Sequence, residues 1–212
     1  APPDDLQGNV IAQLVADELR RLGMEVTAGI GVTGVVGVIR GPERGPTVGL
    51  RADMDALPIE EAVGRPHRST VAGMMHACGH DGHVAMLIVA ARLLAARPAP
   101  DGTVVFVFQP AEEGEAGAQA MIDDGLIERF GIEEIYALHN IPGMPAGALA
   151  VSAGPVMASF DLIDIELSCR GGHAIAPHLA GDVIAAGSYL VTELQAMVAR
   201  RLDPMSPVVA TI

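Results

Sequence analysis

Apolar positions in the first two-thirds of the chain follow two different spacings. Where they recur every three or four residues they predict helices, over residues 8–22, 83–97 and 116–124. Where they run on for a few positions they predict strands, over residues 34–39, 47–53, 103–109 and 134–139. Asp81 is placed to cap the second of these helices. Strands that alternate with helices are typical of a mostly parallel α/β sheet flanked by helices.

The pattern changes after residue 152. Phe160–Cys169 largely alternates apolar and polar residues, as a strand with one exposed face does. A helical pattern over residues 182–202 follows, and residues 207–212 again resemble a strand. We therefore expect an α/β domain over residues 1–155 and the start of a smaller α+β domain over residues 156–212. Because a helical pattern opens the chain and a strand pattern closes it, we expect both domains to be incomplete.

Composition narrows the classes of function. The chain has 212 residues, half of them apolar, which is enough for a sizeable core. Its basic residues are all Arg, which excludes chemistry that needs a Lys nucleophile. The formal net charge of −13 argues against nucleic acid or an anionic membrane as a partner. Two distant cysteines, no signal-like start and no long apolar run predict a soluble, cytoplasmic protein.

Polar side chains follow three of the predicted strands. Asp53 and Asp55 come at the end of the 47–53 strand, Glu112 and Glu113 follow the 103–109 strand, and His139 ends the 134–139 strand. In open α/β sheets, ligands bind at the carboxyl ends of the strands. We therefore expect these side chains to meet at one edge of the sheet, although each of them alone carries a weak signal.

The segment His76–His83 is dense in residues that bind metals. It holds three His, one Cys and one Asp, and Gly79 separates Cys78 from His80 so that a non-helical turn can aim both at one ion. Two other interpretations stay open. The segment can be a His-rich helix start whose groups are satisfied by the backbone, or Cys78 can be a nucleophile activated by His80 or His83.

The adjacent carboxylates Glu112 and Glu113 repel each other, so a cation or proton is expected beside them. One economical arrangement makes Glu113 a metal ligand and leaves Glu112 as the base for a metal-activated water. The alternative is a solvated acidic loop. Asp53 is a candidate for orienting a metal-bound His through a hydrogen bond.

Glycines flank one further histidine, in the second predicted domain. In Gly171–His178 they allow the backbone to bring His173 close to a substrate carboxylate or a developing oxyanion. The alternative is a flexible connection between strand and helix that contains an incidental His.

Together these segments resemble the amidohydrolase branch of the aminoacylase/carboxypeptidase-type dinuclear metallopeptidases. That branch includes hippurate hydrolases, indole-acetyl-amino-acid hydrolases and N-acyl-amino-acid amidohydrolases. The matching strings occur in the order of the family and cover nearly the whole chain: Gly49–Pro58, Met75–His83, Phe108–Gly114, Ala137–His139 and Gly171–Ala174. The resemblance implies a zinc-exopeptidase-like catalytic domain followed by a dimerisation domain.

The resemblance also implies roles for individual residues. It implies a centre of two divalent metal ions, zinc or manganese with cobalt or nickel as further options, whose ligands here are Cys78, His80, Glu113 and His139. It makes Glu112 the general base and acid and gives Asp53 a supporting role. The residue that matches His173 reaches the active site of the partner subunit in this family, which implies a homodimer. The implied reaction is hydrolysis of the amide bond of N-acyl or N-aroyl amino acids.

Members of this family continue beyond the position of Ile212, and the returning segment carries one more His ligand. The resemblance therefore leaves a second interpretation open, in which a truncated or degenerate homologue binds metal or a partner subunit without catalysis.

Overall fold

The computed structural model describes residues 6–62, 64–114, 116–154, 156–157, 159, 161–206 and 208–212. It divides the chain into two compact units, Ala1–Met144 and Pro145–Ile212. The domain boundary at residues 155–156 stays a prediction, because Pro155 lies outside the described residues.

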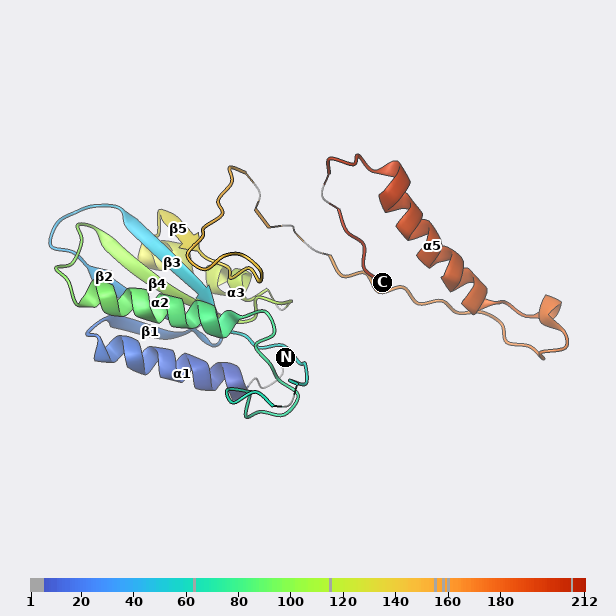
Figure 1. Ribbon diagram of the computed structural model, residues 1–212, viewed down its shortest axis with the longest axis horizontal. Coiled ribbons are helices and arrows are strands. Elements are labelled where there is room, and N and C mark those ends of the chain that lie inside the picture. The colour runs from blue at the N-terminus through green and yellow to red at the C-terminus, as the bar shows by residue number, and fades with distance from the viewer. Residues whose placement is uncertain are drawn as a thin grey trace. The chain divides into compact units, whose positions relative to one another are not determined.

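The first unit is built on a five-stranded sheet (Figure 1). Its strands are β1 (Glu25–Ile30), β2 (Gly34–Arg40), β3 (Thr47–Asp53), β4 (Thr103–Gln109) and β5 (Glu134–Ala137), in the order β1-β2-β4-β3-β5. β3 runs parallel to both β4 and β5, whereas β2 runs antiparallel to β1 and β4. The α/β class is therefore confirmed, with a mixed sheet whose parallel part is β4-β3-β5.

Helices cover both faces of this sheet. α1 (Leu6–Arg21) and α2 (His80–Ala95) pack on one face, where Leu19 and Leu87 meet Phe106 and Phe108 of β4. α3 (Gly117–Asp123) and α4 (Leu126–Phe130) cover the other face, on which Val105 and Val107 of the same strand lie. Because β4 is buried on both faces, it reads in the sequence as a continuous apolar run rather than as an alternation.

Two local expectations need correction. Helix α2, predicted over residues 83–97, begins earlier, at His80, and its N-cap is Gly79 rather than Asp81. Gly79 has φ +87°, a left-handed conformation that Gly adopts without steric cost. Asp81 lies in the first turn of α2 instead, where its Oδ1 accepts the N–H of Gly82. The sequence pattern also missed β1, an edge strand in which only Ile30 is buried.

The second unit contains α5 (Val183–Arg201), which agrees with the predicted helix and is capped by Asp182 through the N–H of Ala185. A short 3-10 helix, η1 (Pro177–Leu179), precedes it. Residues 161–169 and 208–212 form no strand where the structure describes them, contrary to the pattern. A strand needs a hydrogen-bonding neighbour, and alternation along one segment does not supply it. Within the described ranges, no helix is both long and apolar enough to cross a membrane.

Candidate metal centre

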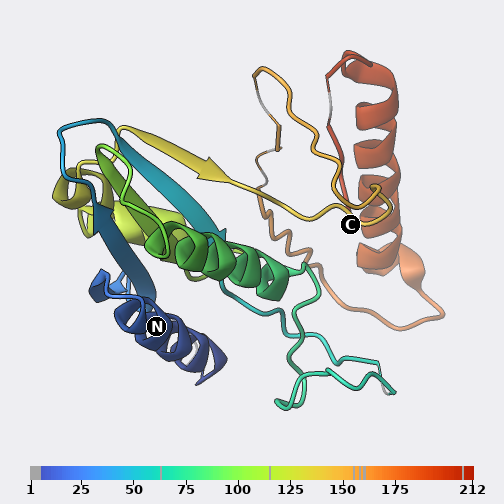
Figure 2. The same cartoon turned by 60° about the vertical axis from the view of Figure 1, so that its left-hand side comes forward.

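The predicted polar clusters meet at one edge of the sheet. β4, β3 and β5 are parallel neighbours, so the segments that follow them emerge on the same side. α2 lies against β3 and begins at this edge (Figure 2). The ligand-capable atoms of Cys78, His80 and His139 lie within 4.8 Å of one another, and so do those of His80, Glu112 and Glu113.

His80 is common to both groups and is fully buried. Its Nδ1–H donates to the backbone carbonyl and to Oδ1 of Asp55, at 3.0 and 3.1 Å. Its Nε2 is buried and has no hydrogen-bond partner, although Oε1 of Glu113 and Oδ2 of Asp53 each lie 3.8 Å away. With the proton held on Nδ1, Nε2 keeps a free lone pair, as in histidines that bind metals.

Cys78 and His139 approach His80 from two different segments. The Sγ of Cys78 lies 3.4 Å from Nε2 of His139, while Nδ1 of His139 contacts the carbonyl of Asn140 at 2.7 Å. Burial and, after it, the neighbouring Glu113 and Glu112 together raise the pKa of the Cys78 thiol to about 11. A nucleophilic cysteine needs a lowered pKa, so this environment argues against Cys78 as the nucleophile.

Asp55 connects His80 to the turn that contains Glu112 and Glu113, hereafter the glutamate turn. The sequence interpretation did not assign this role to Asp55. Its Oδ2 accepts the backbone N–H of Glu113 at 3.0 Å, while its Oδ1 holds His80. Burial raises the pKa of Asp55, but the hydrogen bonds from His80 and from the backbone of Glu113 and Glu112 outweigh it and lower the pKa below its usual value. In the sequence, Asp55 was marked by its position two residues after Asp53, just past the end of the same strand.

The histidine that Asp53 contacts through a hydrogen bond is His83, which is not one of the four proposed metal ligands. Asp53 is buried, and its Oδ1 accepts a short hydrogen bond of 2.6 Å from Nδ1 of His83, while Oδ2 is paired with Nη1 of Arg51 at 2.9 Å. It therefore supports His83 directly, whereas the ring of His80 is oriented by Asp55.

The charges around His80 favour a cation. Four carboxylates lie near this imidazole, those of Asp53, Asp55, Glu112 and Glu113. Burial lowers the pKa of His80, but the hydrogen bond with Asp55 and the charges of its neighbours outweigh it and raise the pKa. A free nitrogen, a thiol and carboxylate oxygens are donors that suit zinc, manganese or cobalt. The residues at this edge therefore fit divalent metal ions.

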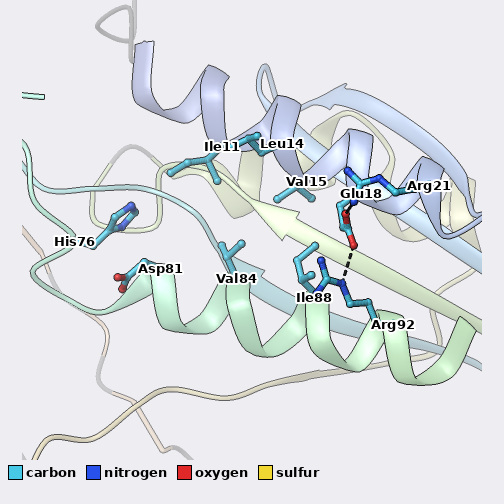
Figure 3. Close-up of a pocket in the computed structure, with 10 residues that line it drawn as sticks. All are labelled: Ile11, Leu14, Val15, Glu18, Arg21, His76, Asp81, Val84, Ile88 and Arg92. Atoms are coloured by element: carbon cyan, nitrogen blue, oxygen red, sulfur yellow. Dashed lines mark hydrogen bonds and ion pairs between the residues drawn. The ribbon is translucent and has the colours of Figure 1, made fainter. Parts of the chain in front are cut away.

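Two other residues of the dense segment lie at a different place. His76 and Asp81 lie at one end of a pocket of about 410 Å³ between α1 and α2 (Figure 3). The walls of this pocket are mostly apolar, and at its other end Arg92 donates to Glu18 at 2.7 Å. The Nδ1 of His76 is buried without a partner, but among the described residues His76 belongs to no group of three ligand-capable side chains. The segment thus divides between two sites.

The remaining predicted site residue, His173, lies in the second unit and is exposed. Its Nδ1 accepts the backbone N–H of Ile175 at 3.2 Å. Its role at a substrate stays a prediction.

Known proteins resemble this chain over most of its length. Hippurate hydrolase of Campylobacter jejuni is 45% identical over 201 residues, which are 95% of this chain and 52% of the relative. N-acetylcysteine deacetylase of Bacillus subtilis is 44% identical over 181 residues, 85% of this chain and 47% of the relative. The chain spans about half the length of these curated relatives.

A solved structure supports the same relationship. The crystal structure of a dinuclear metal-binding peptidase of family M20 from Bacillus subtilis matches with a TM-score of 0.66 and 41% identity, over 71% of this chain and 42% of that protein. The sequence profile of Peptidase family M20/M25/M40 matches residues 49–210, a range that includes Cys78, His80, Glu113 and His139. On these matches the chain belongs to Peptidase family M20/M25/M40.

Proposed function

We propose that the protein is a metal-dependent amidohydrolase that cleaves the amide bond of N-acyl or N-aroyl amino acids. The observation that carries the proposal is the buried Nε2 of His80, which has no partner and lies among ligand-capable atoms of Cys78, Glu113 and His139. The relatives named hippurate hydrolase and N-acetylcysteine deacetylase support this class of substrate, an acyl group joined to an amino acid nitrogen.

Cys78, His80, Glu113 and His139 would hold two divalent ions, which we propose to be zinc or manganese, with cobalt or nickel as alternatives. Such ions would polarise the acyl carbonyl and lower the pKa of a water molecule. Within the chain itself, Asp55 keeps the proton of His80 on Nδ1, so that Nε2 stays available as a donor. Asp55 also fixes the backbone at Glu113 and thereby the glutamate pair.

Glu112 is the proposed acid and base. Its side chain is exposed beside His80, so its carboxylate is open to water and to substrate. In hydrolysis it would take a proton from the attacking water and deliver it to the departing amine nitrogen. We further propose a cytoplasmic homodimer in which His173 contacts the substrate carboxylate or the oxyanion in the active site of the partner subunit.

The test uses the complete natural polypeptide. Elemental analysis should find two divalent ions per chain, and hippurate or N-acetylcysteine should be hydrolysed, with activity lost on chelation and restored by zinc or manganese. Glu112→Gln should keep the metal and lose about 10²- to 10⁴-fold in kcat, the usual contribution of a positioned acid and base. The matched control is Glu128→Gln on α4, an exposed glutamate outside the site, which should keep full activity.

Near-normal turnover by Glu112→Gln would refute the assignment of Glu112. A protein that binds the metal but hydrolyses neither substrate would instead support the interpretation as a non-catalytic homologue.

A further inference from the structure

His83 is buried in the candidate metal centre, yet neither of its ring nitrogens is free. Nδ1 donates to Oδ1 of Asp53 at 2.6 Å, and Nε2 lies 2.7 Å from Oδ1 and 3.1 Å from the backbone nitrogen of Asn140. His80, three residues earlier on α2, has an unpartnered Nε2 instead. The two neighbouring imidazoles therefore differ in what they can bind.

The contacts of His83 belong to a longer network of hydrogen-bonded and ion-paired side chains. Asp53 is paired with Nη1 of Arg51 at 2.9 Å, and Nε of Arg51 donates to Oε1 of Gln109 at 2.9 Å. Gln109 ends β4, Asp53 ends β3, and Asn140 follows β5. This network joins the ends of β4, β3 and β5. It runs from Gln109 through Arg51, Asp53 and His83 to Asn140. The candidate ligands and Glu112 follow these three strands.

At the Asn140 end, this network contacts two segments that carry candidate ligands, the Cys78–His80 turn and the segment with His139. A Cβ on Gly79 would lie 2.2 Å from Nδ2 of Asn140, so the amide of Asn140 sits directly against the turn between Cys78 and His80. The ring of His83 also contacts that of His139, with centroids 4.6 Å apart and planes at 69°. His83 therefore touches the ring of one ligand and, through Asn140, the backbone that presents two others.

We infer that His83 is a positioning residue, which sets the distance between the Cys78–His80 turn and His139 without binding metal itself. This inference rests on the proposed function. The competing arrangement is a site formed by Asp53, His80 and His83, whose ligand-capable atoms also lie within 4.8 Å of one another. It would require His83 to give up a contact with Asp53 or Asn140, whereas the lone pair of His80 is already free.

The test compares metal binding by the complete wild-type polypeptide, by His83→Gln and by a control, His76→Gln. The control changes a histidine of the same segment that lies at the α1–α2 pocket. Zinc stoichiometry and affinity are measured against a chromophoric chelator, and the cobalt-substituted proteins are compared by their absorption spectra. His83→Gln should bind as many ions as the wild type, with affinity lower by about 10- to 100-fold and a changed cobalt spectrum, because supporting groups around ligands have effects of this size. His76→Gln should match the wild type.

Loss of one bound ion in His83→Gln would overturn the inference by making His83 a ligand, and unchanged affinity with an unchanged spectrum would overturn it by making His83 a bystander. If His83→Gln does not fold, Asn140→Ala, which changes an exposed side chain, carries the test. It should weaken zinc binding, because the amide of Asn140 no longer lies against the turn between Cys78 and His80; equal affinity in Asn140→Ala and wild type would overturn the inference. A wild-type protein that binds no zinc, manganese or cobalt would overturn the proposed function as well, and so identifies that failure separately.

Discussion

Gly117 allows the closest approach of two backbone segments near the glutamate pair, and replacing it with Ala should disturb the site from outside. Gly117 opens α3, and its N–H donates to the carbonyl of Ala111, which directly precedes Glu112. A Cβ at this position would lie 1.8 Å from the carbonyl oxygen of Pro110 and 2.7 Å from its carbon. Since both atoms belong to the backbone, no side-chain rotation can relieve the contact.

The size of the effect follows from the distances. Real Cβ atoms essentially never come within 3.0 Å of another heavy atom, so Pro110 and Gly117 must separate by at least about 1.2 Å. Overpacking of this kind costs about 1–3 kcal/mol of stability. A displacement of about 1 Å at a reacting group can lower the rate by about 10²-fold, and the moved segment continues directly into Glu112 and Glu113. Gly117→Ala should therefore lose both stability and turnover.

The assay is urea unfolding followed by circular dichroism, together with hydrolysis of hippurate at saturating metal. Gly82→Ala is the matched control, because its Cβ meets nothing within 4 Å and its φ is not positive. Inside α2 it should stabilise the protein by up to about 1 kcal/mol. A Gly117→Ala protein within about 0.5 kcal/mol of wild type, the usual range of neutral surface changes, and with full turnover would show that this close contact does not constrain the glutamate turn.

Two other perturbations test the surroundings of the site and the helix pair. Asp55→Asn removes the charge that orients His80 and should weaken zinc binding by about 10- to 100-fold at unchanged stoichiometry, measured by chelator competition; unchanged affinity would contradict the role given to Asp55. The hydrogen bond from Arg92 holds the pKa of Glu18 below its ordinary value of 4.5, so this pair stabilises the fold above that value and the stabilisation is lost as the pH falls through the lower, folded-state pKa. Thermal unfolding from pH 6 to pH 3 should show a smaller drop in Tm for Arg92→Met than for the wild type, and equal drops would refute the linkage.

The sequence predicted the part of the fold in which burial dictates the residues. Thr47–Asp53 and Thr103–Gln109 agree with their apolar runs because both strands lie within the sheet between two neighbours. β1 was missed because Glu25–Ile30 buries only Ile30 and has no continuous apolar run. Phe160–Cys169 has the alternation but, over residues 161–169, no strand partner in the structure, and pairing is a property of two segments rather than of one.

The candidate site was predicted to the extent that it depends on topology. Parallel strands deliver their ends to one edge, so Glu113 and His139 could be expected near His80 from their order alone. The sequence could not show that Asp53 contacts His83 while Asp55 contacts His80, because this depends on which ring nitrogen each carboxylate faces. The same holds for His83, whose spacing from His80 is compatible with a ligand and whose contacts are those of a support.

β5 combines two properties that rarely suit each other. All four of its residues are exposed, it forms the outer border of the sheet, and the chain that leaves it carries His139. A proposed metal ligand thus follows the most exposed strand of the sheet. An ion shared between His139 and His80 of α2 would link that edge to the interior, so β5 would open less often with metal bound than without it.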